Sequence, residues 1–122
     1  MLWRVSFSEL REEDGVVEVS SGDLEVRSRS LSLDLFAPRM RVLRGGEEVD
    51  LSEGVRGSLD GSLSFAGRRG KLTLRAGELR LDEGVGLSTS SFSAYCESAV
   101  LGFGETGLLR VEGSGGVLVE LF

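Results

Sequence analysis

Apolar and polar residues alternate with a period of two along most of the chain. Leu24 and Val26 occupy even positions between polar neighbours, whereas Leu31 and Leu33 occupy odd ones. Side chains of a strand point to alternate faces, so this change of parity requires a bulge or a break over 27–30. Alternation of this kind is typical of half-buried β-strands. The pattern therefore predicts strands rather than helices.

Glycines separate further short apolar runs, and the chain has 18 glycines but one proline. Strands bounded by glycine favour tight turns between them. Besides those around Val17 and over 24–35, strands are expected over 39–43, 59–65, 71–76, 79–81, 92–96, 99–103, 108–111 and 117–122. Pro38 is expected to close the unit that precedes 39–43, and 9–14 is the one stretch with the potential for a helical turn.

These elements predict an all-β fold. We expect a single domain over 1–122, built of short antiparallel strands in a sandwich or barrel, with no significant helix. Its length of 122 residues fits one domain.

One internal repeat is visible at an offset of 30 residues, because 48–55 resembles 78–85. Each copy is predicted to be a short strand that enters a Glu-Gly turn, where glycine adopts a positive φ. Two copies are fewer than the three repeats that a solenoid needs. The repeat therefore indicates two equivalent turns in a pseudo-symmetric β domain.

Charge and composition limit the classes of partner that the protein is expected to bind. The net charge of −6 opposes binding to a phosphate backbone, and no apolar run approaches the ~18–20 residues that span a bilayer. Glu9 and Glu12 lie where a signal peptide has its apolar region. A lone cysteine, Cys96, excludes an internal disulfide and is expected to lie in the core. We expect a cytoplasmic protein that binds neither nucleic acid nor membrane.

The absence of histidine excludes Ser-His-Asp and Cys-His catalysis and the usual zinc sites. No catalytic residue, metal or cofactor is therefore expected. Residues 102–107 match G-x-G-x-x-G, but the strand-like segment that follows indicates a β-turn instead of a dinucleotide site. Neighbouring acids such as Asp82 and Glu83 adjoin glycines, which favours a solvated surface.

Two groups of basic residues form a candidate anion patch. Its members are Arg39, Arg41, Arg44, Arg68, Arg69 and Lys71. The repeat makes Arg41 equivalent to Lys71, so the two groups are predicted to share one face. No aromatic side chain lies among them to stack bases. Ion pairs with the 20 acidic residues are their expected use.

The last strand, 117–122, is apolar on both faces. Val117, Val119 and Leu121 share one face, and Leu118, Glu120 and Phe122 share the other. Such a strand needs cover on both sides, and an open edge recruits another chain. We therefore predict a homo-oligomer that associates through Val117, Val119, Leu121 and Phe122. The alternative is that 4–7 covers Leu118 and Phe122 within the same chain.

Two stretches of the C-terminal half carry a resemblance to a known family. Residues 71–81 form a strand, turn and strand, and 102–119 form a glycine-flanked Gly-Leu-Leu strand, a Gly-x-Gly turn and a closing strand. This half resembles the altered-inheritance-of-mitochondria family, whose β fold is called tryptophan RNA-binding attenuator-like. The resemblance implies that fold and no catalytic residues. It does not imply tryptophan or RNA binding.

The leading functional hypothesis is a non-enzymatic, self-associating β module that acts as a structural or interaction protein. A bactofilin-like polymerising β scaffold is an alternative, on the strength of the Gly-Ser-Leu-Asp-Gly-Ser-Leu segment over 57–63. A small carbohydrate- or anion-binding module of unknown ligand, or a hydrolase that uses carboxylates alone, is the alternative from another class.

Overall fold

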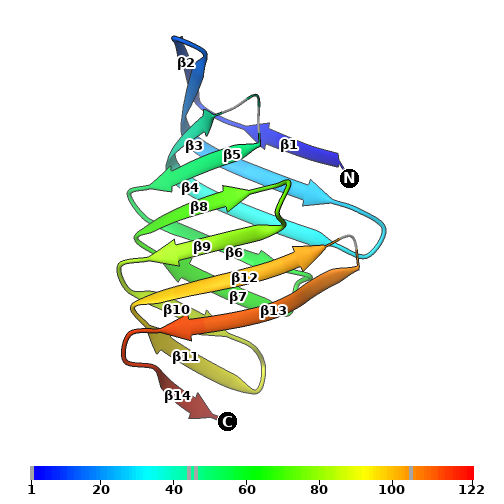
Figure 1. The fold of residues 1–122 in the computed structure, drawn as a ribbon, viewed down its shortest axis with the longest axis vertical. Coiled ribbons are helices and arrows are strands. Elements are labelled where there is room, and N and C mark those ends of the chain that lie inside the picture. Colours follow the sequence, from blue (N-terminus) through cyan, green and yellow to red (C-terminus); the bar gives the residue numbers. More distant parts are fainter. Residues whose placement is uncertain (1, 44, 46, 105) are drawn as a thin grey trace.

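The computed structural model describes residues 2–43, 45, 47–104 and 106–122, and in them 14 strands and no α-helix (Figure 1). The strands are β1 (Leu2–Ser6), β2 (Glu9–Glu13), β3 (Val16–Arg27), β4 (Ser32–Leu43), β5 (Glu48–Ser52), β6 (Val55–Leu59), β7 (Leu63–Gly67), β8 (Arg69–Thr73), β9 (Glu78–Asp82), β10 (Val85–Ser88), β11 (Phe92–Cys96), β12 (Ser98–Gly104), β13 (Gly107–Ser114) and β14 (Leu118–Leu121). The predicted all-β class is confirmed.

The strands form one sheet, and a long central hairpin divides it into two wings. β3 and β4, of 12 residues each, pair along their length. β5 pairs with 39–43 of β4, whereas β6 pairs with 33–36. In the same way β2 pairs with 16–20 of β3, whereas β1 pairs with 23–27.

The front wing has the order β2-β3-β4-β5-β8-β9-β12-β13, and the back wing has the order β1-β3-β4-β6-β7-β10-β11-β14. The two wings lie one over the other and form a curled half-barrel (Figure 1). Every described pairing is antiparallel, which distinguishes the fold from a parallel β-helix.

Pro38 lies where β4 passes from one wing to the other. The β3–β4 register runs from Ser20–Arg39 to Gly22–Ala37 and skips Ser21, which lies opposite Pro38 with a φ of 53°. Proline has no N–H, so it fits where the ladder is interrupted. The expectation that Pro38 closes a unit is wrong, because the strand continues through it.

The inner faces of both wings form one core. It contains Leu33 and Leu35 from the shared β4, Leu51 and Leu79 from the front wing, and Leu87 from the back wing, all nearly inaccessible to water. No polar side chain is buried among the described residues. Cys96 belongs to this core, as its apolar neighbours predicted. No helix in the described part of the chain has the length and apolar character needed to cross a membrane.

The parity change in the first half of the chain corresponds to a real break. β3 ends at Arg27, and Ser28 N donates to Leu31 O at 3.0 Å across the hairpin turn. The strand expected over 59–65 is instead the β6–β7 hairpin, because Asp60 and Gly61 adopt φ values of 54° and 68°. An Asp-Gly pair with two positive φ angles is typical of a tight hairpin turn.

Two further expectations can be compared with the structure. The stretch 9–14 contains strand β2 and no helical turn. The two repeated Glu-Gly turns share one conformation, since Glu53 and Gly54 have φ values of 67° and 103° and Glu83 and Gly84 have 64° and 90°. The non-glycine residue of each pair therefore also adopts a positive φ, which the sequence pattern did not predict.

Candidate functional site

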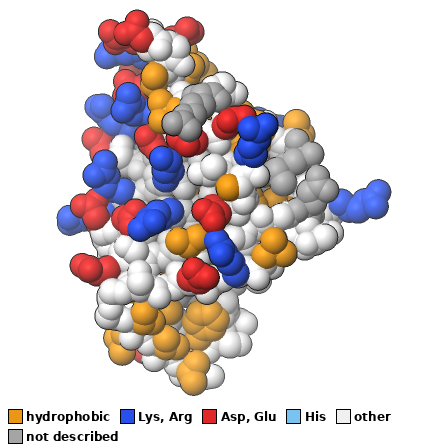
Figure 2. Space-filling view, viewed as in Figure 1, with side chains coloured by type: hydrophobic (Ala, Val, Ile, Leu, Met, Phe, Trp, Pro, Cys, Tyr) orange, Lys and Arg blue, Asp and Glu red, His pale blue; other side chains and the backbone are white. Residues whose placement is uncertain are grey.

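Charged side chains cover the outer face of the front wing. A row across β3, β4, β5, β8 and β9 contains Glu18, Arg41, Asp50, Lys71 and Arg80, each opposite the next in register. Figure 2 shows acidic and basic side chains interspersed over this face. Opposite charges from β3 to β8 attract each other and help to hold these strands together, whereas Lys71 and Arg80 on β8 and β9 are like charges.

The predicted anion patch lies within this charged face. Arg41 Nε is 3.4 Å from Glu18 Oε1, and Lys71 Nζ is 3.5 Å from Glu48 Oε2. β4 and β8 flank β5, so the two basic groups do share one face. The two ion pairs are related by the same 30-residue offset, because Arg41 corresponds to Lys71 and Glu18 corresponds to Glu48.

A second pair of ion pairs obeys the same repeat. Arg39 Nε is 3.4 Å from Glu53 Oε2, and Arg69 Nε is 3.7 Å from Glu83 Oε2. Arg44 lies outside the described residues. Acids therefore accompany most of the patch and reduce its positive field, as expected for paired arginines. Binding of an anion there stays a prediction.

The outer face of the back wing is nearly free of charge between β7 and β11. The residues on this part of the face include Ser64, Ala66, Gly86, Ser88, Ser93 and Tyr95. Charges lie closer to β4, where Arg27 Nη2 is 2.8 Å from Asp34 Oδ1 and the Arg56 guanidinium lies 4.9 Å from the centre of the Phe36 ring. The hydrogen bond to Asp34 raises the pKa of Arg27. The two outer faces thus differ in charge density.

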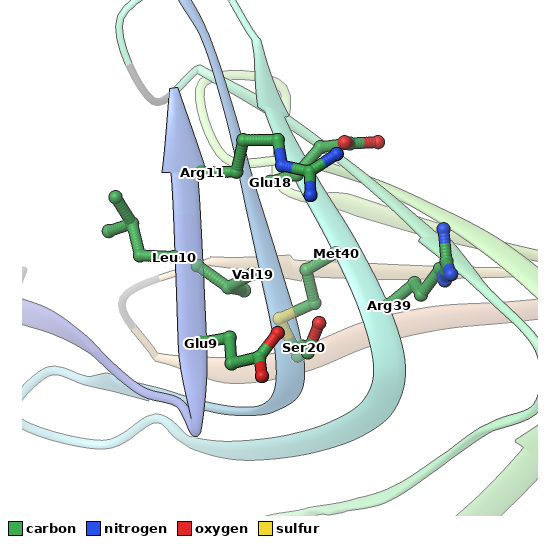
Figure 3. Close-up of a pocket in the computed structure, with 8 residues that line it drawn as sticks. All are labelled: Glu9, Leu10, Arg11, Glu18, Val19, Ser20, Arg39 and Met40. Carbon is green, nitrogen blue, oxygen red and sulfur yellow. The ribbon is translucent and has the colours of Figure 1, made fainter. Parts of the chain in front are cut away.

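A hollow lies at the N-terminal end of the front wing (Figure 3). Its lining comes from β2, β3 and β4 and comprises Glu9, Leu10, Arg11, Glu18, Val19, Ser20, Arg39 and Met40. Glu9 is opposite Ser20, and Glu18 is opposite Arg11, so the two acids lie two positions apart along the strands. Figure 3 shows their carboxylates at opposite ends of the hollow. Two acids so placed do not converge on one bond, and this hollow lends no support to a carboxylate hydrolase.

No group of three or more potential metal ligands occurs among the described residues.

The C-terminal end of the half-barrel exposes its apolar interior. In the described part of the chain, β14 pairs with β11 alone, and β13 pairs with β12 alone. Val119 and Leu121 lie on the inner side, opposite Ala94 and Phe92, yet they are 52% and 81% exposed. Val111 on β13 is 42% exposed. Figure 2 shows hydrophobic side chains gathered at this end.

The predicted self-association residues all lie at this end. They are Val117, Val119, Leu121 and Phe122, and each is at least half exposed. Leu118 is also exposed on the outer side. The segment 4–7 does not cover these residues, because β1 lies at the other end of the back wing (Figure 1).

The N-terminal end repeats this arrangement, which the sequence analysis missed. Trp3 and Val5 on β1 face inward opposite Val26 and Leu24, and Leu10 on β2 faces inward opposite Val19. Trp3 and Leu10 are nevertheless 37% and 53% exposed, whereas Val5 packs partly against the core. The alternation in Leu-Trp-Arg-Val-Ser was a usable signal for this edge, but its neighbour in the sheet lies twenty residues further along the chain.

Comparison with known proteins identifies the fold through solved structures. No family model matches the chain, and no curated protein matches it. Among solved structures, the fold aligns with LptH, the LptA homologous periplasmic component of the conserved lipopolysaccharide transport device from Pseudomonas aeruginosa, with a TM-score of 0.73 and 12% sequence identity. The alignment covers 94% of this chain and 83% of LptH. The chain has the LptH fold.

This match corrects two expectations. The resemblance to an attenuator-like fold is wrong, because the wings form an LptH-like β-jellyroll. Glycine-flanked aliphatic strands occur in any tight β-hairpin, so those motifs did not distinguish the two folds. The expectation of a cytoplasmic protein is also wrong, because LptH, a protein with this fold, is a periplasmic component.

Proposed function

We propose that this chain is a non-enzymatic module that associates end to end with copies of itself and acts as a structural and interaction protein. The observation that carries the proposal is the exposure of apolar inner side chains at both ends of the half-barrel. Fully burying a valine or leucine side chain is favourable by about 1.5–3 kcal/mol. Joining the two ends would bury Trp3 and Val5 of one copy against Val119 and Leu121 of the next.

The direction of the strands supports this geometry. Each wing is an antiparallel series of eight strands, so its first and last strands run in opposite directions. A copy stacked by translation therefore places β14 antiparallel to the next β1, and β13 antiparallel to the next β2. Both wings would continue across the junction with the pairing that they already use.

Sedimentation velocity tests the association. The wild-type chain is expected to grow from 13.1 kDa in whole-chain steps as concentration rises. Val119→Asp and Leu121→Asp each place a charge in the junction and are expected to leave a folded monomer. Ser64→Asp adds the same charge to the exposed outer face of β7, a central strand of the same wing, and is expected to associate normally. A wild-type monomer over the whole micromolar range would refute the proposal.

The second candidate function is the binding or transfer of an amphipathic lipid. With this function the protein would be located outside the cytoplasm. The support for this function is the continuous apolar interior, which reaches water at both ends, together with the description of LptH as a component of a lipopolysaccharide transport device. The apolar side chains between the ends are buried, so an acyl chain would enter at an open end. The C-terminal end is the expected entrance, because Val119 and Leu121 are more exposed there than Trp3 is at the other end.

A fluorescent fatty acid such as dansyl-undecanoic acid tests the lipid candidate. Its emission is expected to rise and shift to shorter wavelength with the wild-type chain and with Ser64→Asp, and to stay as in water with Val119→Asp. Equal emission with Val119→Asp would place the probe elsewhere and reject the open end as its site.

A further inference from the structure

Each edge of the back wing carries one charge at its centre. Arg4 is the middle residue of β1, and Glu120 lies within the short β14. Both side chains are exposed and point to the outer side, because Arg4 is opposite Glu25 and Glu120 is opposite Ser93. Neither forms an ion pair with any residue in the described parts of the chain.

We propose that Arg4 and Glu120 pair across the junction between copies and set both its register and its polarity. This inference rests on the end-to-end association proposed above. The partner is a second copy of this chain, and the two residues determine which edge meets which.

The register follows from strand geometry. With β1 antiparallel to β14 and Arg4 opposite Glu120, Trp3 lies opposite Leu121 and Val5 lies opposite Val119. All four of these apolar side chains then face the interior. A slip of one residue would turn one strand's apolar side chains outward. A slip of two would separate the charges, because Arg4 would then lie opposite Leu118 or Phe122.

The backbone of β14 is ready for this register. Phe122 N donates to Ser91 O at 3.0 Å. Residues of an antiparallel edge strand alternate between bonding inward and pointing outward. The N–H and C=O groups of Val119 and Leu121 therefore point to the open edge.

The backbone of β1 offers the complementary groups. Ser28 N donates to Leu31 O at 3.0 Å, which starts the alternation along β3 and directs Arg27 and Glu25 toward β1. Their partner Arg4 bonds inward, so Trp3 and Val5 point to the open edge. The free backbone groups of the two edges thus face each other in the register that pairs the charges.

The same charges oppose symmetric pairing. Two β1 strands that pair about their centre would place Arg4 opposite Arg4, and two β14 strands would place Glu120 opposite Glu120. Like charges directly opposite each other destabilise a strand pair. The edges therefore favour a heterologous contact, which extends the assembly beyond a closed dimer.

The front wing has a different charge arrangement at its edges. Arg110 on β13 is 2.6 Å from Glu78 and 3.8 Å from Glu112, so it is already paired within its own chain. The opposite edge, β2, carries several exposed charges of both signs instead of a single one at its centre. The back wing is the one in which each edge presents a single charge.

Charge exchange between the two edges tests the inference by sedimentation velocity. Arg4→Glu alone and Glu120→Arg alone are each expected to weaken association by about tenfold, equivalent to about 1.4 kcal/mol. In an equimolar mixture of the two variants, every junction between unlike copies again has opposite charges, and alternating copies are expected to associate as the wild type does. The double variant Arg4→Glu/Glu120→Arg is expected to do the same alone. Arg56→Glu changes the charge of a central strand equally and serves as the control.

The outcomes separate the two proposals. A wild-type chain that stays monomeric would refute both. A wild-type chain that associates, with single variants that associate equally well or a double variant that does not recover, would refute the role of Arg4 and Glu120 and leave end-to-end association standing. Recovery in the mixture and in the double variant excludes misfolding as the cause of the loss.

Discussion

The middle and the C-terminal end of the back wing differ in how far their inner side chains are exposed. One row of side chains that crosses this inner face shows the difference. Phe65, Leu87, Ala94 and Val119 lie opposite one another on β7, β10, β11 and β14, and their exposed fractions are 3%, 4%, 8% and 52%. All four are apolar and face the same interior. The rise at Val119 reflects that, within the described residues, no strand pairs with the second edge of β14. The end of the wing is therefore an unfinished core, with the same pattern as the middle.

The outer faces provide the contrasting case. Exposed residues on the central strands there are mostly charged or small, as in the ion pairs of Arg41 and Lys71 or the serines of the back wing, and Tyr95 is a large exception. Exposure alone does not mark a junction. Apolar character together with an open backbone edge does so.

The largest expected effect distinguishes the middle from the end. Leu87→Ala is expected to lower the free energy of unfolding by about 2–5 kcal/mol, because it removes buried atoms and leaves a cavity. Leu121→Ala is expected to change the free energy of unfolding of the monomer by less than about 0.5 kcal/mol. Urea unfolding at low protein concentration measures both. Equal losses would mean that β14 is buried in the monomer, and would break the comparison.

Two glycines extend the comparison to turns. Gly77, before β9, has a φ of 65°, and its Cβ would collide with the carbonyl O of Phe103. Gly116, before β14, has a φ of 70°, and a Cβ there would meet nothing within 4 Å. Gly116→Ala is expected to cost about 1–2 kcal/mol of unfolding free energy from backbone strain alone, and Gly77→Ala more. A larger loss for Gly116→Ala in thermal unfolding would contradict this order.

The smallest expected effect concerns the charged outer face. Lys71→Ala is expected to lower the free energy of unfolding by about 0.2–1 kcal/mol, because its pair with Glu48 is partly exposed and screened by water. The difference from wild type should shrink as salt is added. Urea titrations at low and high ionic strength provide the measurement. A loss that grows with salt would mean that Lys71 acts through packing.

Local signals predicted much of the fold. The parity change between Val26 and Leu31 located the turn between β3 and β4, and glycine marked most hairpins. Asp60 and Gly61 lie inside the strand predicted over 59–65, although this dipeptide is a strong turn signal. The interruption opposite Pro38 depends on Ser21, which is distant in sequence. Alternation shows which residues share a face, and it does not show which strand lies beside it.

For the same reason, the sequence predicted one of the two apolar ends of the half-barrel but not the other. The two apolar faces of 117–122 identified one edge from a single segment. The other edge needs the pairing of β1 with β3, and the relation between the two ends needs the order of the whole wing. Arg4 and Glu120 become partners only when both ends are known.

Hydrogen exchange of individual backbone amides tests end-to-end association most directly. The amides of Trp3, Val5, Val119 and Leu121 are expected to exchange quickly in dilute protein and to become protected together as concentration rises. Those of Leu79 and Leu87, in central strands, should stay protected throughout. Contradiction would come from edge amides that remain fast while the mass of the particle grows, since the copies would then associate through another surface.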